Sequence, residues 1–384
     1  MKRDMGSEVL RSTGECGQPP LLKRLLPLLA ALALAGCDVL EASPYPVVKS
    51  DLVVTDVNTQ LNLPRFQWLN NHQLVVVAFD HEIPRPNNRA YLTESLVLWD
   101  TTTNTTTKIV EPDVGGLCLR NDQVKYFKRK TDPEGMIPRD SQQREHFVGP
   151  LGKGKRIDFQ EPTDAMTCDS KKMQGGLPDW TKNIPNPEIN IRRLRPEHGF
   201  IVIDRESPRH WPRSIKLYQH EKNAPIDLPR ILEGDGPNPD TLGVYPKWYS
   251  HRQAYYLPAL RSGSPSWWLM PSGELEIAWQ IPDGGIKLPS KTMTRTAISV
   301  ATEIPVIGAS EYNIETIRES GLYALSDFNN PKRIVKGRIA QELEVSPDGC
   351  KVAFGNDDRP TIDPRKPMLF HKLQVINLCP EKTQ

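Results

Sequence analysis

A short unit recurs along most of this 384-residue chain: an apolar strand, a polar turn, and a second apolar strand. One copy pairs residues 66–69 with the β-branched run 74–79, and the last copy pairs residues 343–345 with 350–354. In six such units the second strand is centred near residues 75, 124, 200, 253, 304 and 351. Four of the five intervals lie between 47 and 53 residues, and the fifth is 76 residues long. A period of this length means that one small supersecondary unit is repeated and stacked.

The unit predicts an all-β fold, because its strands are short and further strands follow the first two. Residues 95–100 and 108–110, separated by a polar turn at 101–107, complete a four-stranded meander in the first unit. The chain also has 36 prolines, which favour strand edges and turns and interrupt helices. Repeats of four strands near fifty residues are the signature of a β-propeller. We predict a single β-propeller over residues 47–380 with six blades; seven blades, a parallel β-helix and two β-sandwiches stay open.

The last unit resembles a known family of propellers. Ser346-Pro347-Asp348-Gly349 forms a turn in which proline fixes φ and glycine supplies a positive φ. Together with the strand 351–354, this turn resembles the repeat of TolB-type and related WD-like propellers. Trp99-Asp100, which follows an apolar strand, resembles that repeat as well. In such folds an N-terminal strand commonly completes the last blade, which implies that role for the residues around Val53 and Val54.

The N-terminal region has the order of a secretory signal. Lys23 and Arg24 precede eleven uncharged residues, 25–35, and small residues with a cysteine follow. Eleven residues rise only about 16 Å as a helix, too short for a hydrocarbon core of roughly 30 Å. We therefore expect a signal peptide at residues 1–36, with an unusually long n-region, and a tether at residues 37–46.

The tetrapeptide Leu34-Ala35-Gly36-Cys37 resembles the lipobox of bacterial lipoproteins. The resemblance implies palmitate-type acylation of Cys37, cleavage before it, and a protein anchored by lipid in the cell envelope and facing the periplasm. Two or three acyl chains hold a protein stably at a membrane, whereas one does not. Asp38 resembles an inner-membrane retention signal, and the outer membrane stays open. The alternative is a secreted protein that keeps a cysteine near its mature N-terminus.

Net charge and the absence of known motifs limit the classes of function that the sequence supports. Removing residues 1–36 takes five of 49 basic and three of 47 acidic residues, which leaves 44 of each. A net charge near zero gives no reason to expect a nucleic-acid partner. The histidines lack metal-ligand spacing, Gly-x-Ser-x-Gly is absent, and the acidic stretch 233–240 does not fit an EF-hand. We expect no cofactor, no metal and no catalytic constellation.

Four cysteines remain in the exported part: Cys118, Cys168, Cys350 and Cys379. The compartment permits disulfides, and four cysteines allow three pairings. Cys350 and Cys379 flank one predicted hairpin, which favours a bond between them and leaves Cys118 with Cys168. Four free thiols are the alternative.

Function is predicted from the loops, since propellers present variable loops on a rigid scaffold. Residues 161–190 form an inserted loop, and Trp180 and Trp211 in loops are candidate interface residues because aromatic side chains often anchor contacts. We predict an envelope scaffold that binds another envelope protein. An envelope hydrolase using carboxylates at the channel mouth and a toxin-neutralising immunity lipoprotein are the alternatives.

Overall fold

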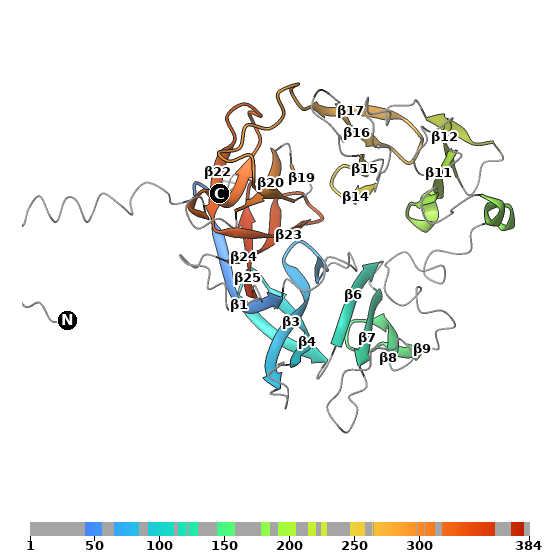
Figure 1. Cartoon of the computed structure of the whole chain (residues 1–384). Coiled ribbons are helices and arrows are strands. Elements are labelled where there is room, and N and C mark those ends of the chain that lie inside the picture. The colour runs from blue at the N-terminus through green and yellow to red at the C-terminus, as the bar shows by residue number, and fades with distance from the viewer. Residues whose placement is uncertain are drawn as a thin grey trace, which may run out of the picture. The chain divides into compact units, whose positions relative to one another are not determined.

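The computed structural model describes residues 43–55, 65–83, 91–110, 114–120, 123–129, 144–157, 178–184, 191–204, 214–219, 224–228, 246–257, 263, 265–296, 298–302, 304–311, 317–357 and 370–379. The chain divides into two compact units, residues 1–43 and a second unit that begins at Pro44. Nearly all regular structure in the described residues is β-strand (Figure 1). They contain no α-helix, only the 3-10 helices η3 (Asp179–Asn183), η4 (Pro196–His198) and η6 (Ile317–Glu319). Accordingly, no helix among them could span a bilayer.

The first three sheets are antiparallel meanders in chain order. Sheet 1 contains β2 (Phe66–Trp68), β3 (Gln73–Ile83), β4 (Tyr91–Asp100) and β5 (Thr105–Val110). Sheet 2 contains β6 (Val114–Arg120), β7 (Gln123–Arg129), β8 (Arg144–Pro150) and β9 (Lys155–Ile157). Sheet 3 contains β10 (Ile191–Arg193), β11 (Phe200–Asp204), β12 (Ser214–Tyr218) and β13 (Ile226–Leu228).

Two further sheets follow the same plan. Sheet 4 contains β14 (Lys247–Tyr249), β15 (Ala254–Leu257), β16 (Pro265–Leu269) and β17 (Leu275–Gln280). Sheet 5 has five strands, since the two short strands β18 and β19 pair with different parts of β20 and together take the place of one first strand. Its strands are β18 (Thr294–Arg295), β19 (Ser299–Ala301), β20 (Ile304–Ser310), β21 (Gly321–Ala324) and β22 (Lys332–Lys336).

Sheet 6 joins the two ends of the folded unit. It contains β23 (Arg338–Val345), β24 (Lys351–Asp357), β25 (Phe370–Asn377) and, as its fourth strand, β1 (Val47–Thr55). The blue strand β1 lies beside the red strands of the C-terminal part (Figure 1), with Val48 opposite Val375 and Val54 opposite His371. The prediction that residues around Val53 and Val54 complete the last sheet is confirmed.

Five pairs of neighbouring sheets share apolar cores within the described residues. Val76 and Trp99 of sheet 1 pack with Val375 of sheet 6, and Leu96 of sheet 1 packs with Val124 of sheet 2. The remaining shared cores join sheets 3 and 4, sheets 4 and 5, and sheets 5 and 6. Four-stranded meanders packed in chain order and closed by the N-terminal strand have the organisation of a β-propeller, as the sequence predicts.

The strand β5 begins earlier than the sequence predicts. Residues 101–107 were expected to form one turn, but Thr105, Thr106 and Thr107 pair with Asp100, Trp99 and Leu98. The physical reason is that threonine is β-branched and suits a half-exposed strand. The turn itself is shorter, and the carboxylate of Asp100 accepts hydrogen bonds from the backbone N–H groups of Thr102 and Thr103.

Candidate functional site

Five charged side chains from three sheets gather where first strands meet, and we call them the first-strand cluster. Its members are Arg65, Glu94, Lys247, Glu342 and Glu344. The Lys247 ammonium, on β14, donates to the Leu343 carbonyl at 2.8 Å and to Glu344 at 3.2 Å, both on β23. Sheets 4 and 6 are not consecutive, so this contact places the cluster where non-neighbouring first strands approach each other.

Sheet 1 joins the same cluster. The backbone N–H of Arg65 donates to Glu342 Oε2 at 3.2 Å, and the Arg65 guanidinium forms an ion pair with Glu94. The indole N–H of Trp68 donates to the Glu344 carbonyl at 2.9 Å. Hydrogen bonds from Arg65, Trp68 and Lys247 to residues 342–344 thus tie β2 and β14 to β23.

The cluster shifts the proton affinities of two members. Burial, and then the nearby Glu344 carboxylate, raise the pKa of Glu342 to about 7 against the opposing effects of Arg65 and Lys247. Burial works against the charged form of Lys247, but Glu344, Tyr249 and Glu342 outweigh it and raise the pKa of that ammonium. Solvent still reaches Lys247, whose side chain is 38% exposed. A carboxyl that titrates near neutrality beside a cation is equipped to exchange a proton.

Glu342 gives a pH-dependent prediction. Its pKa in the folded protein lies above the ordinary value of 4.5, so the stability that its protonation contributes is full below pH 4.5 and lost as pH rises through about 7. The loss amounts to about 3 kcal/mol for a shift of this size. Glu342→Gln is therefore expected to lose less unfolding free energy than the wild type between pH 4.5 and 8. Urea unfolding at both pH values measures this difference.

The matched control is Glu274→Gln, which changes an exposed carboxylate. Its stability should follow the wild-type pH dependence. If Glu342→Gln also follows it, the assignment of a raised pKa to Glu342 is wrong.

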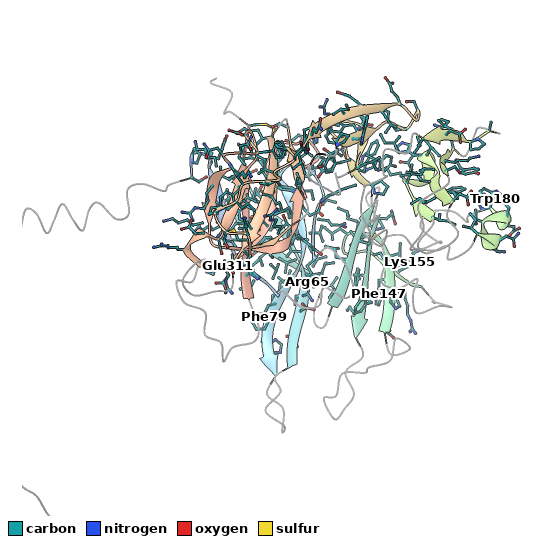
Figure 2. All side chains as sticks on the ribbon, turned by 45° about the horizontal axis from the view of Figure 1, so that its top comes forward. Arg65, Phe79, Phe147, Lys155, Trp180 and Glu311 are labelled. Atoms are coloured by element: carbon teal, nitrogen blue, oxygen red, sulfur yellow. A yellow bond between two sulfur atoms is a disulfide. The ribbon has the colours of Figure 1, made fainter. Side chains whose placement is uncertain are left out.

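A second candidate is the aromatic platform, formed by Trp180, Phe200 and Tyr218. Phe200 and Tyr218 lie opposite each other on β11 and β12, and their rings stack at 5.2 Å with an interplanar angle of 5°. The Trp180 ring packs on them, 4.9 Å from Tyr218 and 6.0 Å from Phe200. Trp180 remains 43% exposed (Figure 2), so an aromatic face fixed by the sheet is open to solvent.

The backbone under Trp180 is also held in place. The short helix η3 begins after Pro178, and the hydroxyl and N–H of buried Thr181 both donate to the Pro178 carbonyl, at 2.7 and 2.9 Å. Ile184 packs against the core that contains Phe200. The sequence predicts Trp180 in a loop; the structure places it in a 3-10 turn, where tilted contacts with Phe200 and Tyr218 hold its ring in place.

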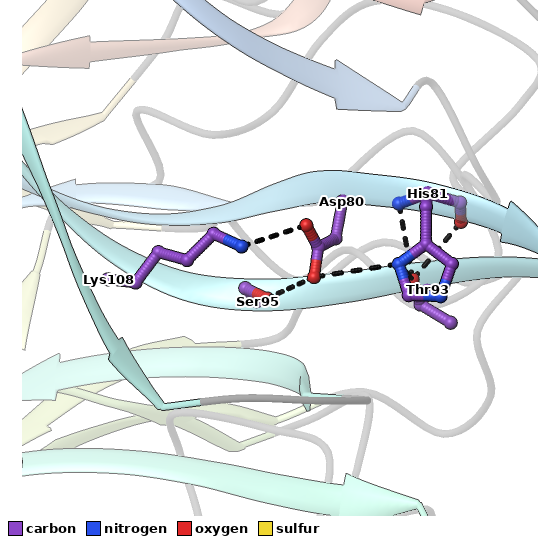
Figure 3. Close-up of polar contacts among 5 residues, drawn as sticks. All are labelled: Asp80, His81, Thr93, Ser95 and Lys108. Atoms are coloured by element: carbon purple, nitrogen blue, oxygen red, sulfur yellow. Dashed lines mark hydrogen bonds and ion pairs between the residues drawn. The ribbon is translucent and has the colours of Figure 1, made fainter.

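A third group, on the long β3–β4 hairpin, contains serine, histidine and aspartate (Figure 3). Asp80 and His81 form a bulge, since the pairing shifts between Phe79 and Glu82. Asp80 accepts a hydrogen bond from Ser95 at 3.1 Å and pairs with Lys108 at 2.9 Å. The hydrogen bond from Lys108 and then that from Ser95 lower the pKa of Asp80 against the effect of burial, so its carboxylate stays charged.

This third group does not have the geometry of a catalytic triad. In a triad, histidine stands between the nucleophile and the carboxylate. Here the Ser95 hydroxyl donates directly to Asp80, while His81 Nδ1 lies 2.9 Å from the Thr93 hydroxyl and 3.7 Å from Asp80. A carboxylate with a lowered pKa is a poor base for serine, so these contacts serve to fix the bulge.

The disulfide prediction is confirmed for one pair. Cys350 and Cys379 are bonded, and the bond joins the start of β24 to the residues after β25. Cys118 is also disulfide-bonded, and its predicted partner Cys168 lies outside the described residues. Cys37 and Trp211 lie outside them as well. In the described part of the chain, no three His, Cys, Asp or Glu side chains are grouped so as to hold a metal ion.

No protein-family model matches the chain, and no curated protein sequence matches it significantly. Among solved structures, the chain is similar to the β-propeller domain of the Trilobed protease from Pyrococcus furiosus, with 10% identity, 81% of this chain and 79% of that chain covered, and a TM-score of 0.28. The Pyrococcus horikoshii acylaminoacyl peptidase has 9% identity, coverages of 78% and 44%, and a TM-score of 0.28. The tricorn protease has 12% identity, coverages of 81% and 26%, and a TM-score of 0.30. The chain spans less than half the length of these two peptidases, and its fold assignment rests on its own sheets.

Proposed function

We propose that this chain is a lipid-anchored binding protein of the bacterial cell envelope, facing the periplasm, whose propeller contacts another envelope protein. The lipobox-like sequence ending at Cys37 supports the anchor, and Asp38 favours the inner membrane. The first described strand, β1, begins at Val47, ten residues after Cys37. A tether of that length reaches at most about 35 Å when extended, so the propeller would work close to the membrane surface.

The binding scaffold is a single propeller of six blades, one for each of sheets 1 to 6. The shared cores between consecutive sheets and the closure of sheet 6 by β1 support this count. Closure of the full ring also requires sheet 2 to meet sheet 3. The predicted insert 161–190 lies between these two sheets in the sequence.

The exposed ring of Trp180 is the observation that carries the binding proposal. Tryptophan is enriched among interface residues that dominate binding energy, and a ring already fixed loses little conformational entropy when a partner docks. Trp180 is held by Phe200 and Tyr218 before any partner arrives. Among the described side chains it is one of two large hydrophobic groups that remain exposed.

Trp180→Ala is expected to weaken partner binding about thirtyfold, which corresponds to about 2 kcal/mol, with little change in folding because the ring is partly exposed. The partner is found by replacing Trp180 with a photoreactive phenylalanine analogue and irradiating intact cells. The same replacement at exposed Lys153, in the β8–β9 turn of sheet 2, is the control. One discrete protein adduct from position 180 and none from position 153 is expected; equal adducts from both positions would contradict the proposal.

A second candidate function, an envelope hydrolase, is favoured by Glu342 in the first-strand cluster. A carboxyl with a pKa near 7 beside a second carboxylate is suited to acid–base catalysis. Hydrolysis of cell-wall fragments should then depend on a group titrating near pH 7 and be lost in Glu342→Gln. If the wild-type protein hydrolyses nothing at any pH, this second candidate is wrong, and the first-strand cluster only links the strands.

A further inference from the structure

The strand β17 is the last strand of sheet 4 and pairs only with β16 within the described residues. It carries Ile277, whose side chain is 56% exposed, next to the exposed Glu276. Ile277 lies opposite Trp267 in the register of the two strands. An apolar side chain on an open strand edge is unusual, because such edges invite pairing with another chain.

The backbone of β17 is oriented for pairing. The N–H of Met270 donates to the Glu274 carbonyl at 2.9 Å, which makes residues 270 and 274 a hydrogen-bonded pair. Hydrogen bonding alternates along an antiparallel ladder, so Glu276 bonds toward β16 while Leu275 and Ile277 direct their N–H and C=O groups away from it. The groups of these two residues therefore face the open edge.

Other outer strands are protected against pairing. β22 has exposed lysines at both ends, Lys332 and Lys336, and β9 begins with exposed Lys155 and Arg156. β5 exposes threonines, and β13 is only three residues long. Lysines, polar side chains and short strands commonly prevent the edge of a sheet from pairing with another chain. β17 has six residues and no lysine, and although Glu276 and Gln280 are exposed on it, the apolar Ile277 is exposed between them, so its edge is less protected than those of β22, β9, β5 and β13.

We propose that β17 receives an extended segment of a partner protein by strand addition, and that this segment alternates basic and apolar side chains. Leu275 and Ile277 share one face of the strand and would contact the apolar side chains. Glu276 points to the other face, and neither it nor Glu274 has an ion pair within the described residues, so these carboxylates would attract the basic ones. A second copy of this chain is disfavoured, because it would bring its own Glu274 and Glu276 to the same ladder.

This edge belongs to sheet 4 and the aromatic platform to sheet 3, and the test distinguishes binding at the two. The probe is a short synthetic peptide in which lysine and valine alternate, with a glutamate–valine peptide as its control, and binding is measured by fluorescence anisotropy. The wild type should bind the lysine–valine peptide only. Ile277→Pro, which removes an outward N–H and spares the bonds to β16, should weaken binding at least about tenfold.

Ile277→Thr keeps the N–H and should retain part of the affinity, whereas Trp180→Ala should bind the peptide as the wild type does. If Ile277→Pro fails to fold, Glu276→Lys tests the proposal instead. This variant should bind the lysine–valine peptide more weakly than the wild type and the glutamate–valine peptide more tightly. Wild-type affinity in both Ile277→Pro and Glu276→Lys would overturn the proposal. A dimer of the wild-type protein in sedimentation that is lost in Ile277→Pro would also overturn the proposal, because the occupant of the edge would then be a second copy of this chain.

Discussion

Asp357→Asn is expected to lower the free energy of unfolding by about 3–5 kcal/mol, because it breaks a buried ion pair from one side. Asp357 and Arg338 are paired residues of β24 and β23, their side chains form an ion pair, and these side chains are only 1% and 2% exposed. Removing the carboxylate leaves the buried guanidinium without this counter-charge. Urea unfolding of the wild type and the variant at neutral pH measures the loss.

The control is to remove both charges together. Replacing a buried pair by apolar side chains of similar size is often neutral, so Arg338→Met combined with Asp357→Leu should recover most of the stability lost in the single variant. A single variant within about 0.5 kcal/mol of the wild type would show that the pair is solvated and contributes little.

Trp99→Ala is expected to cost about 3–5 kcal/mol, because it empties the core between sheets 1 and 6. Trp99 is fully buried and packs in one core with Phe66 and Val375. Its indole N–H donates to Asn104 Oδ1 at 2.9 Å, and the amide of Asn104 donates to the Lys49 carbonyl of β1 at 3.2 Å. Loss of the ring therefore also disturbs the turn that reaches the closing strand.

Trp99→Phe separates the two contributions. It keeps most of the apolar volume and loses the hydrogen bond to Asn104, so its loss of unfolding free energy should be clearly smaller than that of Trp99→Ala. Chemical unfolding of the two variants side by side gives this comparison. Equal losses would mean that the hydrogen bond, and not the cavity, dominates the role of Trp99.

The strand pattern was predictable because it depends on local sequence. Runs of β-branched residues became β3 and β11, and the apolar segment that ends at Phe354 became β24. Ser346-Pro347-Asp348-Gly349 forms the predicted turn, with the N–H of Gly349 bonded to the Ser346 carbonyl at 2.8 Å. The closing strand β1 followed from the family resemblance. Short outer strands such as β9 and β13 were missed, since three residues carry too little periodicity to be recognised.

The sites were harder to predict because their members are brought together by tertiary packing. Lys247, Glu342 and Arg65 are far apart in the sequence, and no spacing rule connects them. The one local signal was Glu342-Leu343-Glu344, two acidic residues flanking an apolar one at the start of the strand predicted at 343–345. Trp180 was identified as a candidate from its residue type, but the contacts of its ring with Phe200 and Tyr218 could not be predicted from the sequence.

The most direct test of the central claim, that a lipid anchor holds this propeller at an envelope membrane, is metabolic labelling with a palmitate analogue. Wild type and Cys37→Ala are expressed in a bacterial host, labelled, and separated into membrane and soluble fractions. The wild type should carry the label and sediment with membranes, while the variant should lose both. An unlabelled wild-type protein in the soluble fraction would contradict the claim.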